Sequence, residues 1–282
     1  MFSLSKKTRR LAIGAAGLGA LIALTGVAGP AVAGTGLLHH GKDKPTVVLV
    51  HGAWADGSSW DKVAAKLQHD GYTVVTPPNT LTGVSDDAAN LRAYLDTITG
   101  PVVLVGHSYG GMVITNAALG DKQVKALVYV DAYIPDKDDT VLSLTTAKPG
   151  SVFAVADTST VFNQVPIPGN KDAGNLYVKP SVFGKAFTGG FVPAKDVALL
   201  AARQRPLSSA ALGEKSGAPA WRSIPSWSVI GKQDAVIPPA EQVVMSQRAK
   251  AHTIEINAPH LSMVTAPGAV TGQIEAAAKA TD

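Results

Sequence analysis

The stretch Gly106-His107-Ser108-Tyr109-Gly110 decides the fold of this 282-residue chain. It follows the apolar run Pro101-Val102-Val103-Leu104-Val105, which is typical of a buried parallel strand. It precedes Gly111–Leu119, an apolar segment closed by Gly120 that indicates a buried helix. We therefore predict a strand, a sharp turn and a helix, with Ser108 at the turn.

The G-x-S-x-G pattern of this turn imposes an unusual backbone on Ser108. Any Gly-rich loop with one serine matches the pattern, so the flanking strand and helix carry the prediction. The turn requires a positive φ at Ser108, a strain of about 1–3 kcal/mol for a residue other than glycine. Gly106 and Gly110 lack a Cβ, so the strand and the helix approach each other closely. The Ser108 hydroxyl is then held at a helix N-terminus, where the helix dipole favours developing negative charge.

Strands and helices alternate on both sides of this turn. The patterns predict strands over 46–50, 72–76, 101–105, 126–130, 226–230 and 252–256, and helices over 58–69, 86–98, 111–119, 239–250 and 267–279. Ser85 is expected to cap the helix that begins at Asp86. This alternation predicts an α/β fold, a mostly parallel sheet flanked by helices on both faces.

Residues 135–220 interrupt the alternation. They are rich in Thr, Ser, Gly and Pro, and aromatic residues are scattered among them. A stretch of this length is not expected to be a bare loop. We predict a partly helical cap inserted over the carboxyl edge of the sheet, with its clearest helix at Val197–Arg203. The core is then formed by residues 34–134 and 221–282, and the substrate pocket lies between sheet and cap.

Residues 1–33 have the three regions of a signal peptide. Four basic residues precede the apolar run Leu11–Val27, and Ala31-Val32-Ala33 is an A-x-A cleavage site. The run is barely long enough to span a bilayer, and glycines interrupt it. We predict export by the Sec or the Tat route and cleavage after Ala33. The expected product is secreted or resides in the periplasm or cell envelope, without stable membrane association.

Charge and cysteine content narrow the classes of function. The whole chain has 25 basic and 21 acidic residues, and removal of the signal's four basic residues leaves 21 of each. The balance therefore gives no reason to expect a nucleic-acid partner. The absence of cysteine excludes disulfides, a thiolate nucleophile and cysteine-ligated metals. The sequence indicates no particular oligomeric state.

Chemically active side chains follow several of the predicted strands, at the edge where open α/β sheets form their sites. Ser108 is a poor nucleophile unless a base takes its proton. His260 follows the last strand, and its ordinary pKa near 6.5 suits a general base. Asp234, after strand 226–230, is placed to orient that imidazole, and Asp131, after strand 126–130, is its rival. We predict a catalytic triad of Ser108, Asp234 and His260.

Backbone donors for such a site come from two places. His51-Gly52-Ala53-Trp54 follows the first strand directly, and we expect His51 to fix this loop rather than to react. The N–H groups of Ala53 and of Tyr109, the residue after the nucleophile, are predicted to form an oxyanion hole. The side chains of Trp54 and Tyr109 are predicted to line the substrate pocket.

Together these residues resemble the α/β-hydrolase superfamily, in the branch of plant hydroxynitrile lyases, methyl-ester esterases and their bacterial relatives. The resemblance covers residues 45 to about 275. It rests on His51-Gly52-Ala53-Trp54 with Trp60, Gly106-His107-Ser108-Tyr109-Gly110-Gly111, Val130-Asp131-Ala132-Tyr133-Ile134-Pro135, Asp234 with Ile237-Pro238-Pro239, and His260. It implies cleavage of a small, moderately apolar carboxylic ester through an acyl-enzyme, with no metal and no organic cofactor.

Three alternatives stay open. Lyases of this branch use a lysine close to the acid loop, and Lys232 is near Asp234 in sequence. An acyltransferase or haloperoxidase-like enzyme would use the same triad, and a binding protein would keep the fold without turnover. Dehalogenases and epoxide hydrolases of the superfamily place Asp at the nucleophile position, so Ser108 argues against both. Arg203 and Arg205 are candidates for binding a substrate carboxylate, although such residues more often form a solvated helix face.

Overall fold

The computed structural model describes residues 44–281, so the predicted signal peptide lies outside the described residues. The described residues contain a six-stranded sheet with the strand order β2-β1-β3-β4-β8-β9, in which all neighbouring strands run parallel. The strands are β1 (Thr46–Val50), β2 (Val74–Val75), β3 (Val102–His107), β4 (Val124–Val130), β8 (Ser226–Gly231) and β9 (His252–Ile256). Because the strands are parallel, their carboxyl ends meet at one edge of the sheet.

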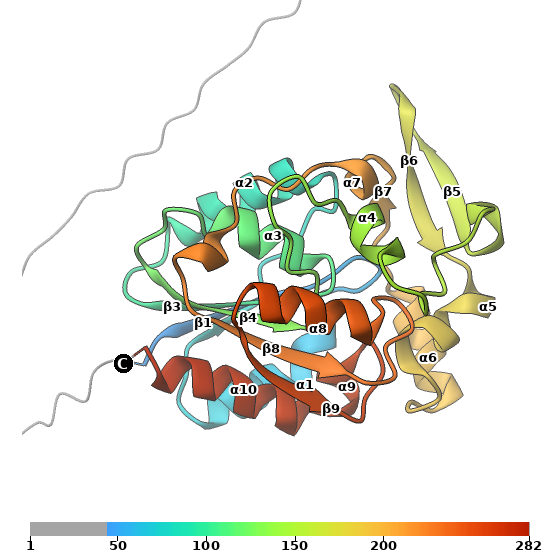
Figure 1. Cartoon of the computed structure of the whole chain (residues 1–282). Helices are drawn as coiled ribbons and strands as arrows, with labels where there is room; N and C mark the ends of the chain where they lie inside the picture. Colours follow the sequence, from blue (N-terminus) through green and yellow to red (C-terminus); the bar gives the residue numbers. More distant parts are fainter. Residues whose placement is uncertain (1–43, 282) are drawn as a thin grey trace, which may run out of the picture. The chain divides into compact units, whose positions relative to one another are not determined.

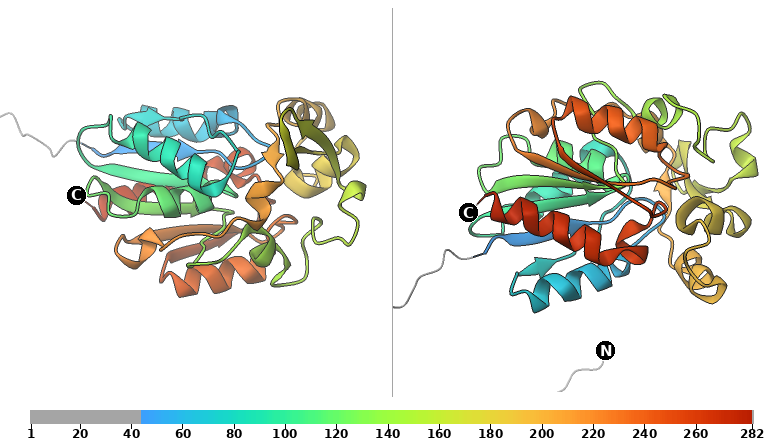
Figure 2. Two further views of the ribbon diagram at one scale, coloured as in Figure 1. Left: turned by 90° about the horizontal axis from the view of Figure 1, so that it is seen from above. Right: turned by 60° about the horizontal axis from the view of Figure 1, so that its bottom comes forward.

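Helices cover both faces of this sheet (Figures 1 and 2). Helices α1 (Asp61–His69) and α10 (Pro267–Lys279) pack together on one face. Helices α2 (Val84–Leu95), α3 (Gly110–Ala117) and α8 (Pro239–Arg248) lie on the other. The layers bury the apolar strands from both sides, and every residue of β3 is buried. The predicted fold class, a mostly parallel sheet flanked by helices, is confirmed.

The start of helix α2 differs from the prediction. Gly83, and not Ser85, is its N-cap residue, and no side chain of the cap position bonds to the helix. The Glu214 carboxylate instead accepts hydrogen bonds from the backbone N–H of Val84 (2.6 Å) and Ser85 (2.9 Å). It also accepts one from the Ser85 hydroxyl, at 2.5 Å. The prediction was wrong because the capping acid is supplied from a distant part of the chain.

Residues 135–220 form a mixture of short helices and a second sheet. Their elements are α4 (Val141–Thr146), η2 (Thr158–Thr160), β5 (Phe162–Ile167), β6 (Asn170–Val178), α5 (Pro180–Phe183), the π-helix η3 (Gly184–Thr188), α6 (Ala194–Ala202), β7 (Leu207–Ser208) and α7 (Ala210–Gly213), followed by η4 (Ala220–Arg222). The predicted helix at Val197–Arg203 corresponds to α6. The antiparallel sheet β5-β6-β7 was not predicted.

Figure 1 shows α5, α6 and the sheet β5-β6-β7 gathered at one end of the six-stranded sheet. Two short elements of the core, η1 (Gly57–Trp60) and α9 (Ser262–Thr265), contact each other. Within residues 44–281, no helix combines the length and the apolarity needed to cross a membrane.

Candidate active site

Ser108 occupies the turn between β3 and α3 in the predicted strained conformation, with a φ of 53°. Glycines make this turn possible. A Cβ on Gly106 would lie 2.6 Å from the carbonyl oxygen of Gly110, and one on Gly110 would lie 2.8 Å from that of Val50. Both separations are shorter than any tolerated contact, so only glycine lets the strand and the helix meet here.

The structure brings His260 to this serine from the loop after β9. The Ser108 hydroxyl lies 2.9 Å from Nε2 of His260. On its other side, Nδ1 of His260 lies 2.7 Å from Oδ2 of Asp234. Since an ionised carboxylate only accepts hydrogen bonds, Nδ1 carries the proton and Nε2 presents its lone pair to the Ser108 hydroxyl. The three predicted triad residues therefore form one continuous hydrogen-bonded chain.

Asp234 is held rigidly by its own loop. Its Oδ1 accepts from the backbone N–H of Val236 (2.7 Å) and Ile237 (2.9 Å). Its Oδ2 accepts from the side-chain amide of Gln242 on α8, at 2.7 Å, besides the imidazole of His260. Four donors on one carboxylate fix both its position and its rotation, so the imidazole is aimed at Ser108.

Burial shifts the pKa values of His260 and Asp234. Ser108 is 2% exposed and His260 is fully buried. Burial lowers the pKa of His260 to about 3, which keeps Nε2 unprotonated at neutral pH and able to accept a proton. Burial also raises the pKa of Asp234, and hydrogen bonds from Val236, Ile237 and Gln242 act against that rise.

The rival acid, Asp131, is committed to other partners. Its Oδ1 accepts from the backbone N–H of Gly231 at 2.8 Å, and its Oδ2 accepts from that of Ser262 at 3.1 Å. Gly231 is the last residue of β8, directly before the loop that carries Asp234, and Ser262 follows His260 by two residues. Asp131 therefore links the end of β8, next to the loop of Asp234, to the segment that follows His260. The acid that bonds to His260 is Asp234. Burial, and then the neighbouring Asp234, raise the pKa of Asp131 well above its ordinary value.

The loop after β1 lies directly against the nucleophile. A Cβ on Gly52 would lie only 2.7 Å from Cβ of Ser108. Within residues 44–281, the backbone N–H groups of Ala53 and Tyr109 donate no hydrogen bond to a protein acceptor. Two unpaired backbone donors next to the serine are what an oxyanion hole requires.

His51 fixes this loop, as its position suggested. Its Nε2 accepts a hydrogen bond from the backbone N–H of Asn79 (3.0 Å), and its Nδ1 lies 2.9 Å from the carbonyl oxygen of Gly52. That carbonyl belongs to the same peptide unit as the Ala53 N–H. His51 therefore holds the peptide whose N–H is a predicted oxyanion donor.

The two residues predicted to line the pocket differ in their surroundings. The indole N–H of Trp54 donates to the carbonyl of Leu176 on β6 (2.7 Å), and its ring contacts those of Phe153, Phe162 and Phe187. Trp54 thus belongs to an aromatic wall shared with residues 135–220. The phenol of Tyr109 instead donates to Oδ2 of Asp87 on α2 (2.8 Å). Its side chain is engaged away from the triad, so we assign Tyr109 a backbone role only.

Sequence reasoning missed two neighbours of His260. Phe187 on η3 meets the imidazole edge to face, with ring centroids 5.5 Å apart. The Nε2–H of His107 donates to the backbone carbonyl of His260 at 3.0 Å. The position of His107 in the G-x-S-x-G turn was a usable signal, whereas nothing local marks Phe187.

Of the three basic residues named as candidates from the sequence, Arg205 contacts the loop after β1 through its backbone, because its carbonyl oxygen accepts a hydrogen bond from the backbone N–H of Trp54 at 2.9 Å. Lys232, Arg203 and Arg205 are all exposed. Among residues 44–281, no group of three or more His, Cys, Asp or Glu side chains is arranged to hold a metal ion.

Comparison with known proteins agrees with this geometry. The sequence profile of the alpha/beta hydrolase family matches residues 47–273. The chain belongs to this family. The superfamily resemblance expected from the sequence is therefore confirmed.

Curated relatives of this alpha/beta hydrolase include esterases. A carbendazim hydrolyzing esterase of Nocardioides sp. (strain SG-4G) is 38% identical over 112 residues, which cover 34% of this chain and 46% of that protein. Methylesterase 10 of Arabidopsis thaliana is 33% identical over 116 residues, which cover 36% of this chain and 40% of that protein. The aligned segments span less than half the length of these relatives. They agree with the esterase branch that the motifs indicated.

Solved structures share the fold. Tomato methylketone synthase I in complex with 2-tridecanone has a TM-score of 0.70 at 18% identity, covering 85% of this chain and 99% of that one. Polyneuridine aldehyde esterase has a TM-score of 0.68 at 19% identity, covering 83% and 98%. An extracellular alpha/beta-hydrolase from a Paenibacillus species has a TM-score of 0.65 at 21% identity, covering 83% and 98%. At these identities the likeness shows the fold alone.

Proposed function

We propose that this protein is a serine hydrolase that cleaves carboxylic esters through an acyl-enzyme. One observation carries the proposal. The hydroxyl of Ser108, strained into a positive-φ turn, lies 2.9 Å from the unprotonated nitrogen of His260, whose other nitrogen is bonded to Asp234. This arrangement supplies a nucleophile, a base and a group that orients the base.

The proposed reaction has two halves. His260 takes the proton of Ser108 while Oγ attacks the ester carbonyl, and the N–H groups of Ala53 and Tyr109 stabilise the oxyanion. The tetrahedral intermediate collapses to an acyl-enzyme as His260 protonates the departing alcohol. Water then attacks the acyl group with His260 again as base, which releases the acid and restores Ser108. Asp234 stabilises the imidazolium formed in each half.

The surroundings of the triad support a small, moderately apolar ester. Trp54, Phe153, Phe162 and Phe187 form the aromatic wall beside His260, and such a wall binds apolar groups in preference to charged ones. The named relatives are esterases, one of them acting on carbendazim and others described as methylesterases, which favours ester cleavage over the other reactions that this triad supports.

A panel of p-nitrophenyl esters with two to twelve acyl carbons tests the proposal. We expect turnover by the wild type, with a preference for the shorter acyl chains, and a loss of about 10⁴-fold or more in Ser108→Ala. Ser159→Ala, at an exposed serine, is the matched control and should keep wild-type rates. A folded wild type that turns over none of these esters, or a Ser108→Ala variant with full activity, would overturn the proposal.

We infer in addition that the enzyme is exported and acts outside the cytoplasm. The basic segment, apolar run and Ala31-Val32-Ala33 site of residues 1–33 support this. Mass spectrometry of the protein recovered from the culture medium or the cell envelope should show an N-terminus at Gly34. Exported protein with an intact Met1 would contradict cleavage, and protein confined to the cytoplasm would contradict export.

A further inference from the structure

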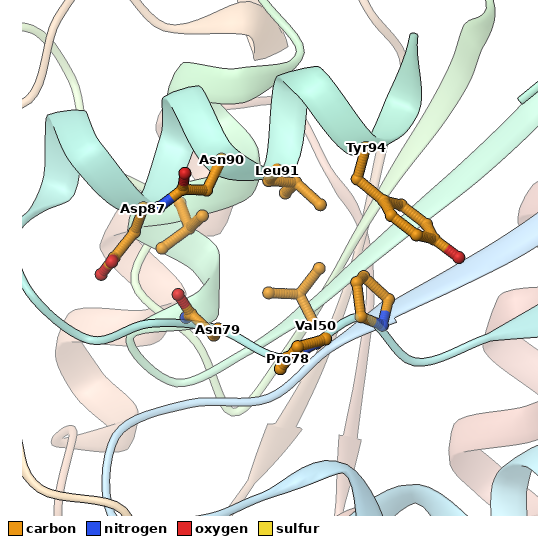
Figure 3. Close-up of a pocket in the computed structure, with 9 residues that line it drawn as sticks. Val50, Pro78, Asn79, Asp87, Asn90, Leu91 and Tyr94 are labelled. Atoms are coloured by element: carbon orange, nitrogen blue, oxygen red, sulfur yellow. The ribbon is translucent and has the colours of Figure 1, made fainter. Parts of the chain in front are cut away.

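The two residues that flank Ser108 anchor the nucleophile turn in different directions. The phenol of Tyr109 donates to Oδ2 of Asp87 at 2.8 Å, and Asp87 lies on α2 beside a pocket that no triad residue lines (Figure 3). The imidazole of His107, the last residue of β3, instead reaches the loop of the proposed base. Its Nε2 lies 3.0 Å from the backbone carbonyl oxygen of His260. Of the two side chains, that of His107 joins the nucleophile turn to the base.

The protonation of His107 is fixed by its surroundings. A carbonyl oxygen only accepts hydrogen bonds, so Nε2 of His107 carries a proton and donates it to the carbonyl of His260. Burial, and then the neighbouring His260, lower the pKa of His107 well below its ordinary value near 6.5. His107 is therefore neutral at physiological pH, and its single N–H is committed to His260.

The second nitrogen of His107 makes no hydrogen bond within residues 44–281. Nδ1 is buried, and it faces the loop after β1, where a Cβ on Gly52 would lie 2.9 Å from it. An unpaired buried nitrogen lowers stability, and an apolar side chain would avoid that cost. The bond from Nε2 to His260 is thus the contribution that distinguishes an imidazole from an apolar residue at this position.

The ring of His107 also packs directly on the imidazole of His260. The two ring centroids are 4.8 Å apart, and the ring planes meet at 52°. Trp60 of η1 meets the His107 ring edge to face, with centroids 6.4 Å apart. All three side chains are fully buried, and close packing of this kind restricts their rotation. His107 therefore contacts both the backbone and the side chain of the proposed base.

The peptide unit that follows the base is held at both of its ends. It consists of the carbonyl of His260 and the N–H of Leu261. The carbonyl accepts from His107, and the N–H donates to the backbone carbonyl of Phe187 on η3 at 3.0 Å. Two opposed hydrogen bonds fix the plane of this peptide and with it the direction of the His260 side chain. Loss of the His107 donor would leave only the bond to Phe187, about which the peptide can rotate.

We propose that His107 is a positioning residue, which keeps the imidazole of His260 at hydrogen-bond distance from Ser108 by binding the carbonyl of His260. Because His107 and Ser108 are consecutive in the chain, the same side chain that precedes the nucleophile holds the base against it. The effect on rate rests on the function proposed above, whereas the effect on the geometry of the triad does not. Rate and geometry are therefore measured separately.

Two substitutions of similar length separate the N–H donor from the bulk of the side chain. His107→Gln keeps an N–H near the place of Nε2, and His107→Met has none. Since a misplacement of about 1 Å costs on the order of 100-fold in rate, we expect kcat on p-nitrophenyl acetate to fall about 10- to 100-fold in His107→Met. We expect His107→Gln to keep kcat within about fivefold of the wild type, and KM to change less than about twofold in both. His69→Met, at a histidine whose side chain is 88% exposed, is the control and should keep the wild-type kcat.

Proton NMR of the full protein reports on the triad without any substrate. The proton on Nδ1 of His260, bonded to the carboxylate of Asp234, should give a low-field signal that is absent in His260→Gln. The wild type and His107→Gln should both show this signal. It should broaden or disappear in His107→Met, because a displaced base weakens its bond to Asp234. A wild type that cleaves no ester would overturn the proposed function but would leave this test of His107 intact.

A third variant covers the case in which His107→Met fails to fold. His107→Asn keeps an amide, but its side chain is one carbon shorter than that of Gln and does not reach the carbonyl of His260, so it should behave like His107→Met. Variants that lose stability in urea but keep the wild-type kcat and the low-field signal would show a structural role alone and would overturn the proposal. Equal losses in the Gln, Met and Asn variants would overturn the assignment to the N–H donor.

Discussion

The substitution Gly52→Ala tests the packing of the oxyanion loop against the nucleophile. A Cβ at this position would lie 2.7 Å from Cβ of Ser108 and 2.9 Å from the carbonyl oxygen of His107, and ordinary contacts begin at 3.4 Å. The loop and the Ser108 turn must therefore separate by about 0.7 Å. Gly52 is not among the glycines with a positive φ, so the effect of the new methyl group is one of space alone.

The expected loss follows from this displacement. A misplacement of about 1 Å in a catalytic arrangement costs on the order of 100-fold in rate, so kcat/KM on p-nitrophenyl acetate should fall by about that factor, mainly through kcat. Overpacking should also lower the free energy of unfolding in urea by about 1–3 kcal/mol.

A glycine elsewhere in the chain gives the matched control. Gly272 lies in α10, and a Cβ there has no neighbour within 4 Å. Gly272→Ala should keep kcat/KM and stabilise the helix by about 0.5–1 kcal/mol. A Gly52→Ala variant with wild-type kcat/KM and stability would refute the close packing of this loop on Ser108.

Three further predictions concern the triad and the start of helix α2. Asp234→Asn retains the shape of the side chain but removes the charge that orients His260. It should lower kcat by about 10⁴-fold and change the thermal unfolding midpoint little. A loss of kcat below tenfold would contradict the orienting role of Asp234. Burial lowers the pKa of His260, and only the neutral imidazole accepts the serine proton. The value of kcat/KM should therefore fall in acid with a midpoint below pH 6.5. A midpoint above pH 6.5 would show that the site favours the charged imidazolium of His260 instead. Glu214→Ala, which removes the acceptor for the first amides of α2, should lower the free energy of unfolding in urea by about 0.5–2 kcal/mol, with a smaller loss in Glu214→Gln; equal stability of all three proteins would exclude the cap.

The strands and helices of the core were predicted well because the sequence signals that mark them lie within each segment. The strand at His252–Ile256 and the helix at Pro267–Lys279 have the predicted bounds. Apolar alternation lies within the strand, and the helix contains its own apolar periodicity and begins with a proline. The strained turn at Ser108 was equally predictable, because the glycines that permit it are adjacent in sequence.

Features that depend on distant residues were missed. Ser85 was predicted to cap helix α2, but the carboxylate that accepts hydrogen bonds from the first backbone N–H groups of the helix belongs to Glu214. No local sequence pattern indicates this distant partner. The sheet β5-β6-β7 was missed because most residues of β5 and the first three residues of β6 are exposed, so neither strand keeps the alternation of a half-buried strand along its whole length.

The candidate site shows the same division. The sequence supplied Ser108, Asp234 and His260 from motif and order, and left Asp131 as a rival. Choosing between two acids that follow neighbouring strands requires the loop geometry, which pairs Asp131 with the backbone of Gly231 and Ser262. The phenol of Tyr109 was placed in the pocket for a similar reason, because its partner, Asp87, lies 22 residues away on another helix.

The most direct test of the proposed chemistry is to trap its covalent intermediate. The wild-type protein, mixed with p-nitrophenyl acetate and quenched in acid during turnover, should carry one acetyl group, and peptide mass spectrometry should locate it on Ser108. The Ser108→Ala variant should carry none. Turnover of the ester without an acetylated Ser108, or an acetyl group confined to another residue, would contradict the account.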